Sequence, residues 1–307
     1  GIRAQPRSRG LGDVYKRQNL SRGNIEVGAN PRGLAITPDG ALLFVNNVLE
    51  GTLSVVDTAN LRTINTVPIT KIPLNPQELL GKQLFNSAAS PVLTTDNWLS
   101  CATCHFDGRT DARTWLNFPD GSRNTPALFG VRHTLPIHWA GDFNELQDVE
   151  ITIRDIQFGV GLVPGDTPKP QGIPLAGLST KLDALAMYMS SIEIPSSPYV
   201  DNLNSIRSGE QYFKKVGCQE CHFPPLYTDL KVHDVGTGTL EFERNNHVDS
   251  SGFDTPSLRG LWLTAPYLHD GSAATLEETL KAGTVHNIFE TLSSNQLREL
   301  IAFLNSL

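Results

Sequence analysis

The sequence predicts a mainly α-helical protein made of two tandem copies of one domain, with a short β segment in front of them. Three observations lead to this expectation. All four cysteines lie in two C-x-x-C-H pentapeptides, at 101–105 and 218–222. Short motifs around the first pentapeptide recur in the same order around the second. The stretch 24–70, in contrast, is rich in short β-forming runs.

Length and composition limit the class of protein. A chain of 307 residues is long enough for two domains. Its net charge of −7 argues against nucleic acid as a partner. No apolar run is long enough to span a membrane, and no secretory signal is visible at the start.

The first part of the chain divides into two segments. Residues 1–18 are rich in Arg and Gly without hydrophobic periodicity, so we expect them to be non-native or disordered. A native basic arm is the alternative. Segment 19–70 contains β-rich runs at Gly33–Thr37, Leu42–Asn46 and Thr52–Val56, separated by turn residues.

The β segment resembles a YVTN-type β-propeller repeat. The resemblance is carried by Asn30–Gly33, Thr37–Gly40 and Phe44–Asn47. Because one blade cannot bury its own faces, we interpret the segment as the last blade of a truncated propeller. A small free-standing sheet packed on the following domain is the alternative.

Helices are expected on both sides of each pentapeptide. Asn75 followed by proline is typical of a helix start and predicts a helix over Pro76–Phe85. A matching helix is expected over Ser205–Phe213. Apolar residues at helical spacing predict closing helices over Leu178–Ile192 and Leu292–Leu307.

The two halves of the chain repeat each other. The corresponding segments are 81–85 and 209–213, 124–130 and 254–260, and 136–141 and 266–271. We therefore expect domains at 71–195 and 196–307, separated near the Pro- and Ser-rich segment Ile194–Tyr199.

The C-x-x-C-H pattern is typical of covalent c-type haem attachment. Two residues between the cysteines place both sulfurs along one porphyrin edge as thioethers, and the next histidine can bind the iron. We therefore expect two covalently bound haem c groups in two cytochrome c domains. The attachment residues are Cys101, Cys104, His105, Cys218, Cys221 and His222, and His105 and His222 are the proximal iron ligands.

Two alternatives to haem attachment fit the sequence less well. A thioredoxin-like redox pair requires a βαβ context, which neither site has. A zinc ribbon requires cysteine pairs roughly 15–20 residues apart, whereas these pairs lie in different halves. A thiol or zinc protein without haem is thus the weaker hypothesis. Covalent haem attachment is extracytoplasmic in bacteria, so we expect a periplasmic or otherwise extracytoplasmic protein whose signal is not in this sequence.

Taken together, these motifs resemble the bacterial dihaem cytochrome c peroxidase and MauG family over 71–307. The resemblance is carried by both pentapeptides and by the segments 123–126, 253–260 and 264–271. It implies a peroxidatic first haem, an electron-entry second haem and a tryptophan near the gap between them, which here is Trp139. An ordinary core aromatic is the alternative role for this tryptophan.

The resemblance also implies a calcium ion at the domain interface. Its protein ligands would be the Asn124 side chain and the backbone carbonyls of Thr264 and Pro266. Oxygen donors of this kind suit a hard cation. A turn residue before Thr-Pro is the alternative role for Asn124.

The chain departs from the family at the second haem. The position where the family commonly has an axial methionine or tyrosine is Gly283. His286 is the nearest candidate for a distal iron ligand, and an exposed loop histidine is its alternative. Met187 and Met189 are expected in the core. His269 is expected to pack or hydrogen-bond in the second haem pocket.

The chain departs from the family at the first haem too. The positions of the family's distal glutamate and distal glutamine are Gly159 and Val149. Glu150, Arg154 and Gln157 lie nearby and could substitute, or could form a solvated helix face. Peroxide cleavage requires a group that moves a proton between its oxygens. The catalytic candidates are Trp139, Glu150 and Gln157, and the available distal ligands are His133 and His138.

Two functions follow from these expectations. The first is reduction of hydrogen peroxide, or peroxide-driven oxidation of a partner, at the first haem with electrons from the second. The alternative is an electron-transfer module serving an attached propeller or a partner dehydrogenase. The expected partners are hydrogen peroxide and a small cytochrome or cupredoxin, or a quinone-linked dehydrogenase. Whether the chain forms a homodimer is left open.

Overall fold

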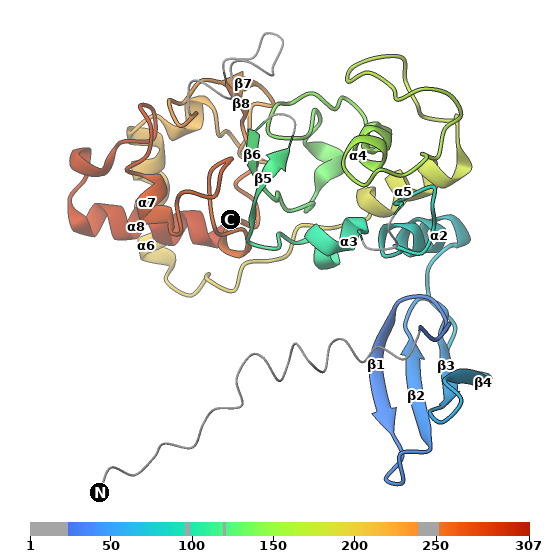
Figure 1. The fold of residues 1–307 in the computed structure, drawn as a ribbon. Helices are drawn as coiled ribbons and strands as arrows, with labels where there is room; N and C mark the ends of the chain where they lie inside the picture. Colours follow the sequence, from blue (N-terminus) through green and yellow to red (C-terminus); the bar gives the residue numbers. More distant parts are fainter. Residues whose placement is uncertain (1–23, 96–98, 119–120, 239–251) are drawn as a thin grey trace, which may run out of the picture. The chain divides into compact units, whose positions relative to one another are not determined.

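The computed structural model describes residues 24–95, 99–118, 121–238 and 252–307. The expectation for residues 1–18 lies outside this part. The chain forms two compact units, divided after Pro73 (Figure 1). Of the described residues, 30% are helical and 16% are in strands, so the fold is mixed and the mainly α-helical expectation holds only in part. No described helix is long and apolar enough to cross a membrane.

The first unit is a four-stranded antiparallel sheet in sequence order (Figure 1). Its strands are β1 (Pro31–Ile36), β2 (Leu42–Asn47), β3 (Thr52–Asp57) and β4 (Arg62–Pro68). The three β-rich runs predicted a strand each, and β4 is an additional strand. Asp39 shapes the β1–β2 turn by accepting hydrogen bonds from the Thr37 hydroxyl at 2.6 Å and the Ala41 amide at 3.0 Å.

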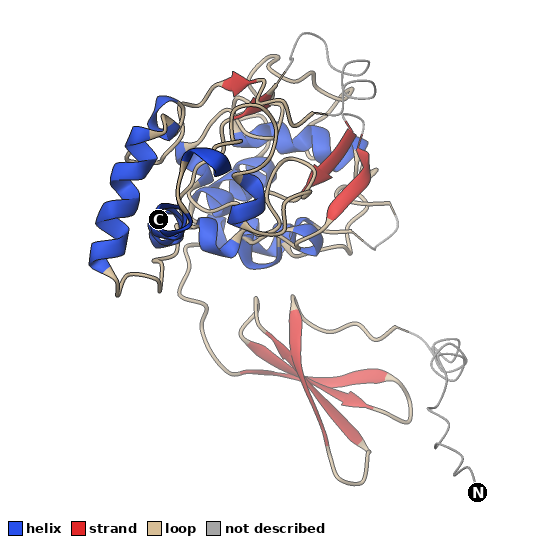
Figure 2. Ribbon diagram, turned by 90° about the vertical axis from the view of Figure 1, so that its left-hand side faces the viewer, coloured by secondary structure: helices blue, strands red, loops and turns tan. Residues whose placement is uncertain are grey.

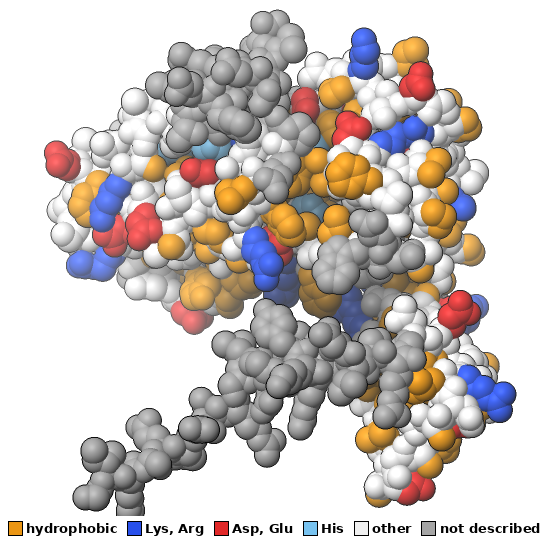
Figure 3. Space-filling view, viewed as in Figure 1, with side chains coloured by type: hydrophobic (Ala, Val, Ile, Leu, Met, Phe, Trp, Pro, Cys, Tyr) orange, Lys and Arg blue, Asp and Glu red, His pale blue; other side chains and the backbone are white. Residues whose placement is uncertain are grey.

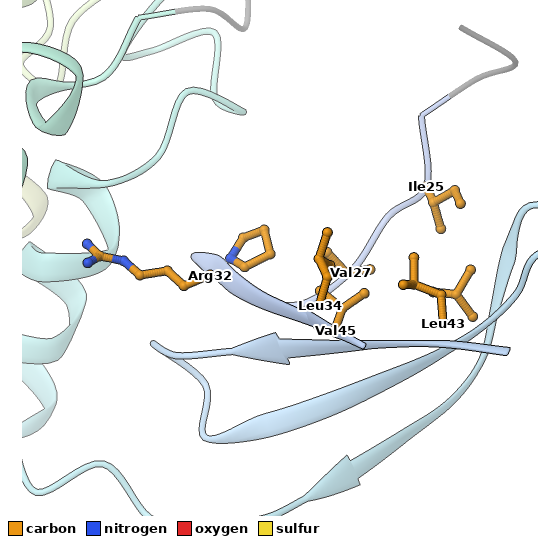
Figure 4. Close-up of a pocket in the computed structure, with 8 residues that line it drawn as sticks. Ile25, Val27, Arg32, Leu34, Leu43 and Val45 are labelled. Atoms are coloured by element: carbon orange, nitrogen blue, oxygen red, sulfur yellow. The ribbon is translucent and has the colours of Figure 1, made fainter. Parts of the chain in front are cut away.

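One face of this sheet is apolar. The register pairs Leu34 with Val45 and Leu43 with Val56, so these four side chains share a face. Figure 4 shows Ile25 and Val27 extending over the same face. Leu34 remains 71% exposed. The propeller origin of the sheet stays a prediction.

The second unit contains the helices and two short pairs of antiparallel strands (Figure 2). Its α-helices are α2 (Pro76–Phe85), α3 (Cys101–Cys104), α4 (Val149–Asp155), α5 (Thr180–Ser190), α6 (Leu203–Lys215), α7 (Leu276–Thr279) and α8 (Ser294–Ser306). Its strands are β5 (Thr114–Phe118), β6 (Gly121–Asn124), β7 (Val232–His233) and β8 (Phe253–Asp254). Short 3-10 turns are η1 (Phe106–Gly108), η2 (Val131–His133), η3 (Leu146–Asp148), η4 (Cys218–Glu220), η5 (Leu261–Leu263) and η6 (Phe289–Thr291).

Side-chain caps determine where the helices begin. The predicted start of α2 is confirmed, because Asn75 Oδ1 accepts from the Glu78 amide at 2.9 Å. The closing helices α5 and α8 begin two residues later than expected, since Ser179 and Ser293 cap them. Asn202 caps α6, which therefore begins before Ser205.

The same helix pair occurs in both halves of the second unit. Helix α2 packs on α5, and α6 packs on α8 (Figure 1). A glycine allows the close approach in each pair, because a β-carbon at Gly81 would overlap the Ala184 carbonyl and one at Gly209 would overlap the Glu299 carbonyl. The sequence repeat therefore coincides with a repeat of packing, within one compact unit.

Replacing Gly81 by Ala tests this close approach. The added methyl group would force α2 away from α5, so we expect a loss of about 1–3 kcal/mol in the free energy of unfolding. Denaturant unfolding of the haem-loaded protein, followed by circular dichroism, measures it. Gln77→Ala on the exposed face of α2 is the control and should change stability by less than about 0.5 kcal/mol. Equal stabilities of the two variants would contradict the packing argument.

Candidate haem sites

The two C-x-x-C-H segments fold into similar tight turns. The His105 amide donates to the Cys101 carbonyl at 2.8 Å, and the His222 amide donates to the Cys218 carbonyl at 2.9 Å. Each turn brings two cysteines and one histidine to one place. All four cysteines are free of disulfides.

Burial keeps the thiols in their neutral form. It raises the pKa of Cys101 and Cys218 to about 11 each, and that of Cys104 to about 12. Within the described part of the chain, the one cluster with metal-ligand spacing is Cys221 with Asp229 and His233. The four cysteines do not converge, which contradicts the zinc-ribbon alternative.

The two histidines are neutral, as iron ligands must be. Burial lowers the pKa of His105 and of His222 to about 4. His222 Nδ1 lies 2.9 Å from the Tyr227 carbonyl, and because a carbonyl only accepts, Nδ1 carries the proton and Nε2 keeps a lone pair. At His105, a hydrogen bond to the Pro126 backbone opposes part of the lowering of the pKa by burial. Both residues fit the role of proximal haem ligand.

His286 lies near the second attachment turn. Burial lowers its pKa, and its charge is one of the causes that lower the pKa of His222. Its Nδ1 atom is buried without a hydrogen-bond partner. The alternative of an exposed loop histidine is therefore wrong. Met189 lies in the core as expected, whereas Met187 is 37% exposed.

At the first site, the structure distinguishes the two candidate distal histidines. His133 is exposed and accepts a hydrogen bond from Arg132 Nε at 2.8 Å. His138 lies close enough to His105 to contribute to its lowered pKa. The centroid of the His138 ring lies 3.7 Å from that of Phe143, with the ring planes tilted by 35°, and His138 Nδ1 lies 3.2 Å from Asp142 Oδ1.

Glu150 is buried, so the expectation of a solvated helix face is wrong for this residue. Its side chain is 0% exposed. Its carboxylate accepts from Arg154 Nε at 2.8 Å and from the Leu162 and Val163 amides at 2.9 and 3.2 Å. Residues 161–163 fold back over α4, and this long-range contact has no local sequence signal. These bonds argue for a structural role.

Gln157 lies at the first attachment turn. Its side chain is 7% exposed, and its Nε2 lies 3.8 Å from Cys101 Sγ. Its Oε1 is buried without a hydrogen-bond partner. Gly159 follows it, and a β-carbon there would overlap the backbone of Val92 and Leu93. Backbone thus fills the position of the family's distal glutamate.

A symmetric pair of backbone hydrogen bonds joins the two halves. The Asn124 amide donates to the His269 carbonyl at 2.6 Å, and the Asp254 amide donates to the Trp139 carbonyl at 2.8 Å. Trp139 Nε1 also donates to the Asn124 carbonyl at 2.8 Å. The Trp139 and His269 rings lie edge to face at 6.4 Å. His269 is stacked on Phe253 at 3.8 Å, so the expected packing role is met by this contact.

Two of the three expected calcium ligands, Asn124 and the Pro266 carbonyl, lie in contact at this boundary. Asn124 Nδ2 donates to the Pro266 carbonyl at 2.5 Å, and Asn124 Oδ1 is buried without a hydrogen-bond partner. An orphaned amide oxygen beside a carbonyl fits a hard cation. Thr264 lies two residues before Pro266, at the end of η5. The calcium ion itself stays a prediction.

Asp254 occupies the position that corresponds to Asn124. Burial raises its pKa from 3.8 to about 7, and the charge of Asp229 adds to the rise. Its Oδ1 is buried without a hydrogen-bond partner. One half thus has an amide and the other a carboxyl group at the boundary.

Comparison with known proteins identifies the class. A family model described as RoxA-like, cytochrome c-like matches residues 252–296. The chain is 26% identical to the hydrazine synthase subunit gamma of Kuenenia stuttgartiensis, covering 74% of this chain and 76% of that protein. It is 27% identical to MauG of Methylorubrum extorquens (81% and 83%) and 25% identical to the cytochrome c peroxidase Ccp of Escherichia coli (77% and 59%).

Solved structures agree on the fold. A structure of Kuenenia stuttgartiensis hydrazine synthase under xenon pressure has a TM-score of 0.58 and 22% identity, covering 99% of this chain and all of that chain. A MauG-like protein associated with microbial copper homeostasis has a TM-score of 0.57 and 21% identity, covering 78% and 91%.

The fold and the attachment turns therefore define a cytochrome c-like protein with covalently bound c-type haem. Its homologues are the bacterial cytochrome c peroxidases and MauG proteins, and this relationship supports a haem-dependent oxidoreductase. The family resemblance expected from the sequence is confirmed.

Replacing Cys101 and Cys104 by Ala should abolish covalent haem at the first site only, because thioethers require both sulfurs. Intact mass from a maturation-competent host should fall by about one haem, relative to a protein carrying two. The matched change at Cys218 and Cys221 should remove the other haem. An unchanged mass in either variant would contradict the assignment.

Stability should depend on pH through Asp254. A carboxyl whose pKa is raised on folding contributes stability below pH 3.8 that is lost as the pH rises through about 7. Asp254→Asn should therefore stabilise the haem-loaded protein at pH 8 by on the order of 1 kcal/mol and change little at pH 4. Denaturant unfolding at both pH values measures this. The exposed Asp155→Asn is the control, and a destabilised Asp254→Asn at pH 8 would overturn the argument.

Proposed function

We propose that the protein is a dihaem peroxidase that reduces hydrogen peroxide, or oxidises a partner with it, at the first haem. Electrons would enter at the second haem. The observation that carries this proposal is the difference between the two sites. His286 faces the proximal His222, whereas Gln157 lies beside the Cys101 sulfur of the first turn.

The side chains of the first site would leave one axial position of the haem iron open. Bound haem supplies redox chemistry and, where one axial position is open, a place for peroxide to bind. The neutral His105 would hold the first iron from one side. His138 is held by Phe143 and Asp142, which would keep its ring off the iron.

Gln157 would orient peroxide at the first site. Its Oε1 atom has no hydrogen-bond partner and can accept a hydrogen bond from an O–H group of peroxide, while its NH2 group can donate one. An amide does not exchange protons as a carboxylate does, so a proton would have to come from water or another group. We therefore assign Gln157 to binding and orientation. Glu150, the other carboxylate candidate, would serve the fold through Arg154.

Electrons would cross between the halves near Trp139. Its indole lies at the boundary, and its N–H is bonded to the Asn124 carbonyl. A calcium ion at Asn124 and Pro266 would hold the same boundary. We further propose two tandem cytochrome c domains, a small cytochrome, a cupredoxin or a quinone-linked dehydrogenase as electron donor, and an extracytoplasmic location.

An electron-transfer module without peroxidase activity is the second candidate. It is favoured by Gly159, whose contact with Val92 and Leu93 leaves no space for a distal glutamate. It is also favoured by Glu150, whose oxygens are already bonded. In that case the first haem would also have two protein ligands, with His138 moving onto the iron.

The two functions differ in the effect of Gln157→Ala. Peroxidase function predicts that peroxide turnover of the haem-loaded, pre-reduced protein falls by about 10-fold to 100-fold, because an orienting hydrogen bond is lost. Gln147→Ala, outside this site, is the control and should leave turnover unchanged. Wild-type turnover in Gln157→Ala, or two six-coordinate haems without any turnover in the wild type, would favour the electron-transfer module.

A further inference from the structure

The two attachment turns carry the same side-chain arrangement beside them, with one exchange. In the first half, Trp115 Nε1 donates to Asp111 Oδ2 at 3.1 Å. In the second half, His233 Nε2 lies 2.7 Å from Asp229 Oδ2. The register is the same as well, since Trp115 pairs with a β6 residue and His233 pairs with Phe253 of β8. A titratable imidazole thus stands where the first half has an indole.

The His233 imidazole lies next to the haem-attachment sulfur. The sulfur of Cys221, a carboxylate oxygen of Asp229 and a ring nitrogen of His233 all lie within 4.8 Å of one another. Cys221 Sγ is the atom that joins the porphyrin. The inference therefore rests on the proposed second haem, whose edge would lie beside this histidine.

Asp229 is a suitable partner for a protonated histidine. Burial would raise its pKa, but hydrogen bonds from the His233 and Thr255 side chains outweigh burial and keep the pKa below its ordinary value. The carboxylate side chain is 6% exposed, whereas the imidazole is 37% exposed and can exchange protons with water. Asp229 is thus a buried negative charge, and His233 is a titratable group that water can reach.

Other charged groups surround the pair. Glu220 and Lys231 act on Cys221 with opposite signs. Asp254 lies across the β7–β8 pair and is influenced by Asp229. His286 acts on His222 from the other side of the site. Of these, Asp254 is the main competitor for a proton near neutral pH.

We propose that His233 takes up a proton when the second haem takes up an electron, so that electron entry and proton uptake are coupled. One electron enters the haem and up to one proton moves from water to His233, so the charges balance. The physical reason is that reduction removes a positive charge beside the imidazole and lowers the repulsion of its protonated form. By linkage, protonation of His233 stabilises the reduced haem. Peroxide reduction consumes electrons and protons together, so this coupling suits the proposed function.

A redox titration of the second haem in the full, haem-loaded protein between about pH 5 and 8 tests the proposal. In the wild type, the midpoint potential should fall as the pH rises, by at most about 59 mV per pH unit. This slope corresponds to a tenfold change in the equilibrium constant for reduction. The His233→Gln side chain can still donate a hydrogen bond to Asp229 but does not titrate. In this variant the potential of the second haem should no longer change with pH. Asp254→Asn should keep the slope. Trp115→His should give the first haem a slope that it lacks.

Two results would overturn the proposal. One is a wild-type potential that does not change with pH, and the other is a slope that persists in His233→Gln. Loss of the slope in Asp254→Asn alone would also overturn it, by assigning the proton to Asp254. Pyridine haemochrome content is measured first for each protein. A missing second haem contradicts the proposed dihaem function, whereas two haems with a pH-independent potential contradict this coupling only.

Discussion

The exchange of two backbone hydrogen bonds between the halves determines how the rest of the second unit is arranged. The Asn124 amide bonds to the His269 carbonyl, and the Asp254 amide bonds to the Trp139 carbonyl. Buried backbone groups must be paired, so this exchange fixes the ends of β6 and β8. It also fixes the loops that carry Trp139 and His269. Hydrophobic side chains gather around this part of the unit in the space-filling view (Figure 3).

The two halves share a backbone and differ in chemistry. Gly81 and Gly209 each permit a close helix contact, and an aromatic pair packs beside each contact at 5.1 and 5.3 Å. The differences are concentrated at corresponding positions near the haem sites. Trp115 and Trp139 of the first half correspond to His233 and His269 of the second. Asn124 corresponds to Asp254. Such changes alter charge and proton binding without altering the packing that holds each turn.

At the first site, backbone fills the position where the family resemblance leads us to expect a distal glutamate. The turn at Gly159 packs against Val92 and Leu93, where a glutamate would overlap the chain. Glu150 is nearby but satisfies the amides of Leu162 and Val163. Gln157 Oε1, in contrast, is buried without a hydrogen-bond partner. An amide such as that of Gln157 can hydrogen-bond a ligand but does not exchange protons as a carboxylate does.

Local chemistry was readable from the chain alone. The start of α2 depends on Asn75 and the residues after it, so it was predicted correctly. The C-x-x-C-H turns depend on five consecutive residues, and haem attachment at both of them stays a prediction. The burial of Glu150 was not predicted. His286 was a candidate for the second site, but the sequence could not decide between that position and an exposed loop. Each depends on a loop that returns from a distant part of the chain, and periodicity and spacing carry no record of such contacts. Only the packed chain decides which polar atoms lose water and which find a partner, and that decision sets the charge at each haem site.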